Sequence, residues 1–410
     1  MIDFAVIGFG ARGQLYTELL IKNNCQLKAI CDIDESRIDA AKKGFPSDGV
    51  EYFTSVDDFF NKGQLAKLLI ISTLDQCHFE HTIKAIKAGY DILLEKPIAC
   101  TLEEVQKIYD ASVKHHTRVF ICYVLRYAPF FIEIKKLLDS KKFGDIATIN
   151  LTENVAYWHQ AHSFVRGNWR NSKESTPMIV AKCCHDLDII SWFMNEEPEY
   201  VSSMGDLILF KKENAPKDAS HYCFECKYQK TCPYENSHFY KKYPWWIRQV
   251  GWYYGDLEDK KAIEECLKNK NNPYSRCVYY CDNNVVDHQI TNIYYKNGAT
   301  AHLTMTAFSD DTYRSIHIHC TFGEIYGDMV ENVLHCKIFG GEKWNIDLSK
   351  MGGIEGHGGG DSLMIKQLVD SYSDDNQQMK SAIKEALTSH KLAFLSEESK
   401  NEKGKRIKIS

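Results

Sequence analysis

The stretch FAVIGFGARG, residues 4–13, decides the fold of the N-terminal part of the chain. Its first four residues form a short apolar run, typical of a strand buried on both faces, and lead directly into Gly8-x-Gly10-x-x-Gly13. A helical pattern follows at residues 15–20, and a second apolar run at 27–31 ends at Asp32. This order of strand, glycine-rich loop, helix, strand and acidic residue predicts a dinucleotide site.

Each residue of this motif has a physical role. Gly8 permits the tight turn, Gly10 lets the backbone approach a pyrophosphate, and Gly13 lets the helix pack close to the strand. The first turn of the helix offers free amide groups and a partial positive charge to the phosphates. The Asp32 carboxylate is placed to accept ribose hydroxyls and would repel a 2′-phosphate, so the sequence favours NAD over NADP.

Strand and helix patterns continue to alternate beyond this motif. Apolar runs at 68–73, 91–94 and 119–123 predict further strands, with helical patterns between them. Repeated strand–helix units predict a parallel sheet covered on both sides, and ligands bind beyond the carboxyl ends of such strands. Lys96 follows one of these strands directly, so we expect it beside the nicotinamide end of the site.

Length and composition narrow the class of protein. The 410 residues suggest two or three domains, and the 44% apolar and 26% charged residues are normal for a folded chain. A net charge of −5 argues against a nucleic-acid partner held by bulk charge. The first residues leave no room for a secretory signal, and no apolar run approaches the ~20 residues of a membrane helix. We therefore expect a cytoplasmic protein without a membrane partner, whose fifteen cysteines are mostly reduced.

These motifs resemble those of the Gfo/Idh/MocA family, named for glucose–fructose oxidoreductase, inositol dehydrogenase and a rhizopine catabolism protein. Glu95-Lys96-Pro97 is the most specific local match to that family. The other matches are the loop at 8–13, Asp32, Thr73 with His78, the segment RYAP at 126–129, Gly144-Asp145-Ile146, Trp169-Arg170, His185, Asp188 and the segment FLSEES at 394–399.

The resemblance implies an α/β chain of two domains. Residues 1–124 would form an NAD-binding Rossmann domain with a parallel sheet. Residues 125–410 would form an α/β domain with a large, mostly antiparallel open sheet, whose outer face joins the subunits of a homodimer or homotetramer. The implied activity is hydride transfer between NAD and a secondary hydroxyl of a sugar or sugar derivative. The predicted cofactor contacts are Gly8, Phe9, Gly10, Ala11, Arg12, Gly13, Asp32, Ile33, Thr73, His78, Glu95, Lys96 and Arg126.

The predicted catalytic residues are Lys96, His185 and Lys182. His185 is the expected proton acceptor, because a histidine is partly neutral near working pH. Lys96 would hydrogen-bond the reacting oxygen and stabilise developing negative charge. Both fall where the family has its catalytic lysine and histidine. The family often has aspartate four residues before the histidine, whereas this chain has Ala181. Lys182 is either a second cation for an anionic or keto-bearing substrate or the partner of a nearby carboxylate.

Two further segments suggest substrate contacts. An aromatic and polar stretch at 157–169 suits stacking on a sugar ring, or capping of the domain interface. The segment GHGGGD at 356–361 resembles segments of family branches that act on sugars, including NAD-dependent glycosidases, and its glycines let backbone lie close to a ligand. The predicted substrate contacts are Tyr157, Trp169, Arg170, Asp188, His357 and Asp361.

A cysteine-rich segment at about 211–285 is predicted to be an insertion in the second domain. It carries Cys223-x2-Cys226-x5-Cys232 and Cys277-x3-Cys281. Four thiolates from this set would form a tetrahedral zinc site that holds a segment with little core of its own. The alternatives are free or packed cysteines, or a redox-labile disulfide. The spacing is not one of the usual iron–sulfur runs.

Three functions remain open at the level of sequence. The first is an NAD-dependent dehydrogenase of a sugar or sugar derivative. The second is an NAD-dependent glycoside hydrolase, which oxidises the sugar transiently at carbon 3, eliminates the aglycone, adds water and reduces the product. The third is a non-catalytic NAD-bound sensor, against which the presence of both Lys96 and His185 argues.

Overall fold

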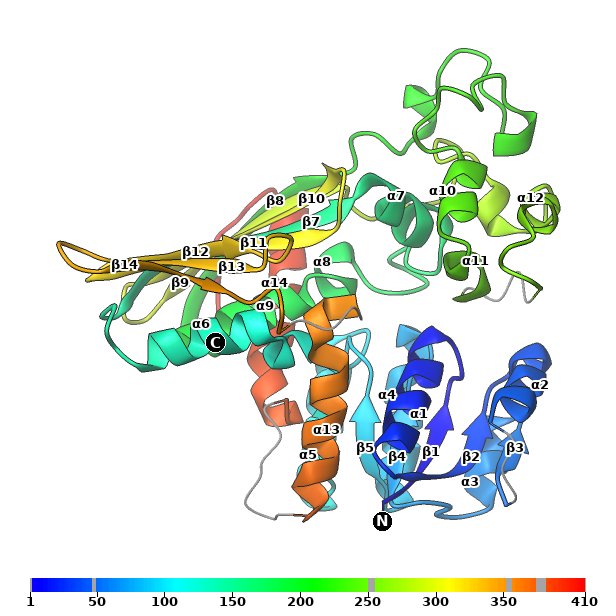
Figure 1. Cartoon of the computed structure of the whole chain (residues 1–410), viewed down its shortest axis with the longest axis horizontal. Coiled ribbons are helices and arrows are strands. Elements are labelled where there is room, and N and C mark those ends of the chain that lie inside the picture. Colours follow the sequence, from blue (N-terminus) through cyan, green and yellow to red (C-terminus); the bar gives the residue numbers. More distant parts are fainter. Residues whose placement is uncertain (1, 46–48, 250–254, 352–355, 374–380, 410) are drawn as a thin grey trace.

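The computed structural model describes residues 2–45, 49–249, 255–351, 356–373 and 381–409. The chain builds two sheets, one in each part of the sequence, and Figure 1 shows them at an angle to each other with helices between. None of the helices in these ranges is both long and apolar enough to span a membrane.

The first sheet is a six-stranded parallel sheet in the order β3-β2-β1-β4-β5-β6. The predicted Rossmann arrangement is thereby confirmed. Its strands carry long apolar runs because both faces are covered, as expected of a parallel sheet. The strands are β1 (Asp3–Ile7), β2 (Gln26–Cys31), β3 (Glu51–Phe53), β4 (Leu68–Ile71), β5 (Asp91–Leu94) and β6 (Val119–Ile121).

The helices of this sheet come mostly from the same stretch of chain. They are α1 (Ala11–Lys22), α2 (Glu35–Gly44), α3 (Val56–Asn61), α4 (Asp75–Lys87) and α5 (Leu102–Lys114). Thr101-Leu102-Glu103-Glu104 has the sequence of a capping box, and the Thr101 and Glu104 side chains each bond the other's backbone N–H at the start of α5.

One helix on the first sheet comes from the far end of the chain. Met364, Ile365 and Leu368 of α13 (Gly360–Ser373) lie in the same buried cluster as Phe4 and Val6 of β1. In Figure 1, α13 stands beside α1 and the parallel strands. The cover of the Rossmann sheet therefore includes residues from outside 1–124. The limits 1–124 and 125–410 stay a prediction about folding units.

The second sheet has nine strands in the order β14-β13-β12-β11-β7-β10-β9-β8-β15. Only β7 and β10 pair in parallel, and the other neighbours are antiparallel, so the predicted mostly antiparallel open sheet is confirmed. The strands are β7 (Ile146–Ala156), β8 (Pro198–Asp206), β9 (His288–Tyr295), β10 (Thr300–Ser309), β11 (Tyr313–Cys320), β12 (Gly323–Asp328), β13 (Val333–Ile338), β14 (Lys343–Asp347) and β15 (Ile407–Lys408).

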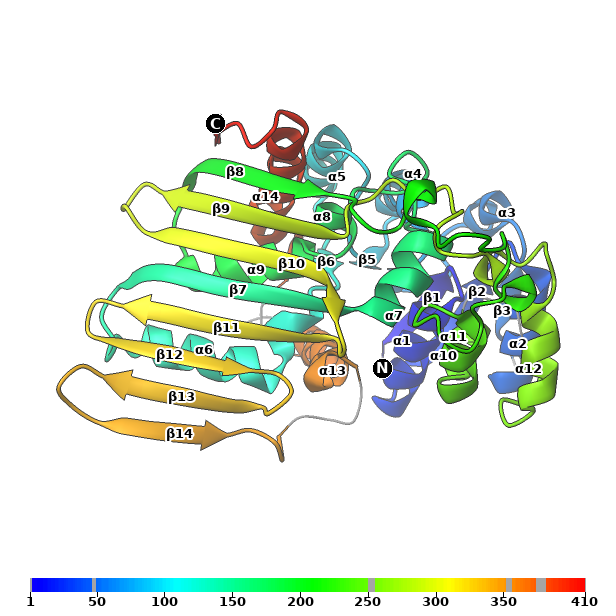
Figure 2. The same ribbon diagram turned by 90° about the horizontal axis from the view of Figure 1, so that it is seen from above.

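The helices of the second domain gather on one face of this sheet. Figure 2 shows the strands in front, with α6 (Pro129–Asp139), α9 (Cys184–Met194) and α14 (Ile383–Asn401) behind them. Alternate residues of each strand, such as Ile316 and Ile318, are buried against these helices. We call the opposite face, turned toward the viewer in Figure 2, the open face. Short helices η1 (Val124–Tyr127), α7 (Tyr157–His159), the π-helix η2 (Gln160–Arg166) and α8 (Met178–Ala181) connect the layers.

The segment 211–285 forms a small helical unit beside the two sheets. A cluster of Tyr240, Ile247, Ile263, Leu267 and Tyr274 packs its helices together. In Figures 1 and 2 this unit lies beyond α7, on the side of the chain that carries α1 and α2. Its elements are η3 (Lys212–Asn214), η4 (Cys223–Glu225), α10 (Asn236–Lys242), α11 (Trp245–Gln249), α12 (Lys260–Leu267) and η5 (Pro273–Ser275).

His390 on α14 fastens the second domain to the first. Its Nε2 accepts a hydrogen bond of 2.9 Å from the Ile98 N–H, and its Nδ1 lies 2.8 Å from the Tyr123 hydroxyl. Because Nε2 accepts a hydrogen bond, it carries no proton, and the imidazole ring is therefore neutral. Burial lowers the pKa of His390 to about 4.

We expect His390 to make the protein sensitive to acid. The unfolded chain binds a proton at His390 near pH ~6.5, whereas the folded chain binds it only near pH 4. The stability due to the neutral ring is therefore complete above about pH 6.5 and is lost as the pH falls toward 4. Over that window His390→Gln, which does not titrate, should reduce the slope of unfolding free energy against pH by up to ~1.4 kcal/mol per pH unit.

Urea unfolding at a series of pH values measures this slope. The matched control is His115→Gln, because His115 lies at an exposed position after α5. Equal slopes for wild type and His390→Gln would contradict the expectation.

Candidate active site

The glycine-rich loop has the shape that a dinucleotide requires. Gly8 has φ +89°, and a Cβ there would lie 2.6 Å from the Ser72 carbonyl oxygen. A Cβ on Gly13 would lie 2.2 Å from the Gly8 carbonyl oxygen. Both positions therefore need glycine. The helix α1 begins within this motif, at Ala11, with Gly10 as its N-cap. The amides of its first turn are the groups that would hold the phosphates of NAD.

Asp32 lies against this loop from the end of β2. Its Oδ2 accepts a hydrogen bond of 2.6 Å from the Phe9 N–H, and its Oδ1 accepts one of 2.9 Å from the Asp34 N–H. Arg37 Nη1 lies 3.3 Å from Asp32 Oδ2. The next side chain, Ile33, is 82% exposed. The carboxylate is thus fixed at the loop, where it suits the ribose of a bound dinucleotide.

Arg12 connects the loop to two distant segments. Its Nε lies 2.6 Å from Glu95 Oε1, and its Nη2 lies 2.6 Å from Asp361 Oδ1. The Tyr16 hydroxyl donates to the same Glu95 oxygen at 2.7 Å, and Glu95 Oε2 accepts from the Lys96 N–H at 3.0 Å. Two predicted cofactor residues and one predicted substrate residue therefore meet in one ion-pair chain.

Lys96 and His185 come together from the two domains. Lys96 Nζ donates a hydrogen bond of 2.9 Å to the carbonyl oxygen of Ala181, immediately before the segment that carries His185. His185 is 3% exposed, and among the described residues its Nδ1 has no hydrogen-bond partner. Burial, and then the positive charge of Lys96, lower the pKa of His185 well below its usual range. The result is a neutral imidazole with an unpaired nitrogen near an ammonium group.

His357 lies near His185 and is paired with Asp361. The two imidazole rings of His185 and His357 are 5.7 Å apart. His357 Nδ1 lies 2.9 Å from Asp361 Oδ2, at the junction of η6 (Gly356–Gly359) and α13. Burial lowers the pKa of His357, although Asp361 opposes this effect. Burial alone would raise the pKa of Asp361, but Arg12 and His357 hold it at about 2, so the carboxylate is ionised.

Lys182 belongs to a buried cluster of four charged side chains. Its Nζ lies 3.1 Å from Glu153 Oε1, and Arg314 lies 2.7 Å from the other Glu153 oxygen and 2.6 Å from Asp186 Oδ1. Of the two interpretations of Lys182, the structure shows the pairing with a carboxylate. Burial raises the pKa of Asp186 to about 6, although Arg314 opposes this effect.

Glu153, Asp186 and Arg314 are not among the site residues that the sequence predicts. The signal for Glu153 is present in β7, where the inward positions are Ile149, Leu151, Glu153 and Val155, so an acid interrupts a buried apolar face. A buried acid needs a cationic partner, and that requirement leads to Arg314 on the neighbouring strand.

Several predicted residues bind other protein groups. Arg126 and Asp188 form a buried two-point ion pair with distances of 2.7 and 2.8 Å, which fixes η1 to α9. His78 lies between the carbonyl oxygens of Thr73 and Pro97, at 3.1 and 2.7 Å, and so joins the ends of β4 and β5. These side chains hold the segments that follow the carboxyl ends of the parallel strands in position.

The aromatic stretch also makes contacts within the protein. Trp169 Nε1 donates to Asp75 Oδ1 at 3.1 Å, which links the two domains. Arg170 contacts both carboxylate oxygens of Asp282, at 2.8 and 3.0 Å. The Tyr157 ring packs edge-on against Tyr234 of the segment 211–285, with centroids 5.9 Å apart. Of the two interpretations of this stretch, these contacts fit the capping of an interface.

The five cysteines of the predicted zinc site are free thiols. Among the described residues, no three of their sulfur atoms lie within 4.8 Å of one another. Cys281 Sγ donates to the Cys277 carbonyl at 3.3 Å, and Cys223 Sγ accepts from Arg166 at 3.4 Å. The zinc site is therefore not preformed in the structure and stays a prediction.

Both parts of the chain match models of one protein family. Residues 2–123 match the model of an oxidoreductase family with an NAD-binding Rossmann fold, and residues 135–409 match the C-terminal alpha/beta domain of the same family. The chain belongs to the Gfo/Idh/MocA oxidoreductase family. The resemblance inferred from Glu95-Lys96-Pro97 and the glycine-rich loop is confirmed.

Individual Gfo/Idh/MocA relatives are distant. The YteT protein of Bacillus subtilis is 23% identical over 360 residues, which cover 84% of this chain and 82% of YteT. Inositol 2-dehydrogenase of Klebsiella pneumoniae is 28% identical over 201 residues, 48% of this chain and 55% of that enzyme, so the match spans about half of the relative. The WlbA dehydrogenase of Bordetella pertussis, solved with NADH and UDP-GlcNAcA, has a TM-score of 0.68 at 16% identity, covering 100% of this chain and 99% of WlbA. That similarity shows the fold.

Proposed function

We propose that this chain is an NAD-dependent dehydrogenase that acts on a secondary hydroxyl of a sugar or sugar derivative. The observation that carries the proposal is the buried, neutral His185, with an unpaired ring nitrogen, near Lys96. A relative named as an inositol dehydrogenase and a structural neighbour solved with NADH and a nucleotide sugar support the substrate class.

The residues divide the chemistry as follows. The imidazole of His185 accepts the hydroxyl proton while the C–O bond of the substrate becomes a carbonyl. Lys96 donates a hydrogen bond to the same oxygen and stabilises its negative charge before the carbonyl forms. NAD, when bound, supplies the acceptor for the hydride. In the reverse direction His185 returns the proton to the oxygen.

Cofactor choice rests on Asp32. Its carboxylate is held by the Phe9 and Asp34 amides and so is ready to bind two ribose hydroxyls. A 2′-phosphate would bring negative charge against it, which favours NAD over NADP. The adjacent Arg37 reduces this repulsion in part, since it lies 3.3 Å from the carboxylate.

A second candidate activity is NAD-dependent glycoside hydrolysis. The observation that favours it is the second imidazole, His357, held by an ionised Asp361 and 5.7 Å from His185. Elimination after oxidation at carbon 3 needs a base for the carbon-bound proton and an acid for the departing aglycone, which a second histidine can supply. A dehydrogenase needs only the first proton acceptor.

A single screen separates the candidates. Sugars, inositols, sugar acids and synthetic glycosides are offered with NAD, and both NADH absorbance and released aglycone are followed. We expect NADH to accumulate with a free sugar or cyclitol and no aglycone to be released. Aglycone release with substoichiometric NAD and no net NADH would establish the glycosidase. Tight NAD binding with no turnover on any compound would favour the sensor.

Assembly is a further part of the proposal. We propose a homodimer or homotetramer joined through the open face of the nine-stranded sheet. The face is broad, and its strands carry half-buried threonine and histidine side chains between buried ones. Sedimentation velocity tests this assembly.

A further inference from the structure

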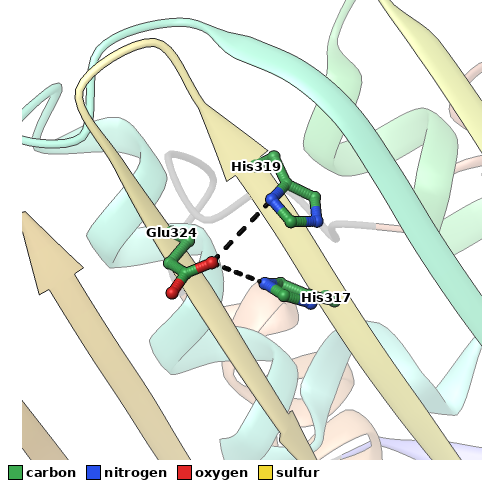
Figure 3. Close-up of side chains that lie close together, drawn as sticks. All are labelled: His317, His319 and Glu324. Carbon is green, nitrogen blue, oxygen red and sulfur yellow. Dashed lines mark hydrogen bonds and ion pairs between the residues drawn. The ribbon is translucent and has the colours of Figure 1, made fainter. Parts of the chain in front are cut away.

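Three side chains of types that bind metals meet on the open face, away from the proposed active site. His317 and His319 are two residues apart on β11, so they project from the same face. Glu324 on β12 lies directly opposite His319 in the strand register. Figure 3 shows all three side chains turned toward one another in front of the sheet, and the dashed lines mark their contacts. We call this group the His–His–Glu cluster.

The ligand atoms of the cluster are close enough to share an ion. His317 Nε2 lies 2.9 Å from Glu324 Oε2, and His319 Nδ1 lies 3.9 Å from the same oxygen. Within the described ranges this is the only group of three such side chains whose ligand atoms all lie within 4.8 Å of one another. In a tetrahedral site with metal–ligand distances of ~2.0–2.2 Å, neighbouring ligand atoms are separated by distances similar to these contacts of 2.9 and 3.9 Å.

The surroundings hold the cluster in position. Lys337 Nζ donates to Glu324 Oε1 at 3.0 Å, which fixes the carboxylate and leaves Oε2 toward the histidines. The rings of His317 and His319 are 3.9 Å apart, and Tyr326 packs 5.0 Å from His317. Side-chain exposures of 38%, 40% and 21% for His317, His319 and Glu324 leave one side of the cluster accessible to solvent.

We propose that the His–His–Glu cluster binds one divalent transition-metal ion per chain, of the zinc, cobalt or nickel class. Two imidazoles and one carboxylate form a nitrogen–oxygen ligand set, and such a set binds these ions in preference to magnesium or calcium. In the single chain the remaining coordination positions face solvent and would be filled by water; in the proposed dimer they would face the second subunit. The proposal is independent of the dehydrogenase, because the catalytic side chains lie on other elements, with α9 on the opposite face of the sheet.

The competing explanation is an ordinary surface ion pair between a protonated histidine and Glu324. It predicts no affinity for zinc beyond that of other surface histidines. His302 provides that comparison, because it lies on β10 in the same sheet and its two ring nitrogens contact Asn292 and Thr304 instead of an acid.

Isothermal titration with zinc chloride at neutral pH tests the proposal on the whole chain. We expect wild type to show a saturable site that is at least about tenfold weaker in His317→Ala and Glu324→Gln and unchanged in His302→Ala, whether or not the cysteines bind zinc as well. NAD binding should be the same in all four proteins, which shows that each has folded. Equal zinc affinity in wild type and Glu324→Gln would overturn the proposal.

Cobalt distinguishes this site from the cysteines of the segment 211–285. Cobalt bound by thiolates absorbs strongly in the near ultraviolet through sulfur-to-metal charge transfer, whereas a site of imidazole and carboxylate does not. We expect cobalt binding that depends on Glu324 and lacks this absorption. If the only cobalt bound shows thiolate absorption and survives Glu324→Gln, the His–His–Glu cluster is not a metal site.

Discussion

Replacing His185 with alanine should lower turnover by about 10²–10⁴-fold while NAD still binds. The neutral imidazole is the proposed proton acceptor, and the described residues offer its Nδ1 no other partner. The glycine-rich loop and Asp32 lie on the first domain and do not contact this ring, so cofactor affinity should be unchanged. Steady-state kinetics on the best substrate of the screen gives the turnover, and fluorescence titration gives the affinity for NAD.

The pH dependence of kcat/KM tests whether His185 accepts the proton, because it would not change if His185 had only a structural role. Because burial and Lys96 lower the pKa of His185, the acid limb of wild-type kcat/KM should lie below pH ~6.5. Activity falls as the pH drops through that pKa, since protonated imidazole cannot accept a proton. His185→Ala should lose this limb, and His335→Ala, on the open face, should keep it. Unchanged turnover in His185→Ala would remove this histidine from the proton-acceptor role.

Replacing Gly10 with alanine should weaken NAD binding by about tenfold or more, which corresponds to ~1.4 kcal/mol. In the structure a Cβ on Gly10 would meet only Arg37 Nη1, at 3.5 Å, so the chain itself tolerates the methyl group. The methyl group would instead occupy the space through which the backbone approaches the pyrophosphate. Titration calorimetry with NAD measures the loss of affinity, and thermal unfolding without NAD shows whether the stability of the chain has changed.

Two other glycines serve as controls for this experiment. A Cβ on Gly44, at the end of α2, has no heavy atom within 4 Å, so Gly44→Ala should alter neither NAD affinity nor stability appreciably. Gly13→Ala should reduce both, because its Cβ would lie 2.2 Å from the Gly8 carbonyl oxygen. Full NAD affinity in Gly10→Ala would show that the cofactor does not rest on this loop.

The sequence predicts most of the first domain because its signals are local. The strand at residues 4–7, the loop at 8–13 and Asp32 follow one another within 29 residues, and each part restricts the next. The capping box at Thr101 is likewise contained in four residues. The meeting of Lys96 and His185 is inferred from family resemblance, and in the structure Lys96 Nζ bonds the carbonyl oxygen of Ala181, in the segment that leads to His185.

The remaining site depends on contacts between distant segments, which no local pattern encodes. Arg12 and Asp361 are 349 residues apart, and Arg314 and Asp186 are 128 apart. The sequence leaves Lys182 as either a second cation for the substrate or the partner of a carboxylate, because that partner, Glu153, lies on another element. Arg126 and Asp188 each resembled a ligand contact, although the two side chains bind each other.

The return of α13 to the parallel strands has a consequence during synthesis on the ribosome. Phe4 and Val6 belong to an apolar cluster that is completed only by Met364, Ile365 and Leu368. Arg12 likewise meets Asp361 only when that part of the chain has emerged. A nascent chain that ends before residue 360 therefore leaves part of its earliest-made core uncovered, so the parallel-sheet domain, although translated first, is packed completely only after α13 has emerged.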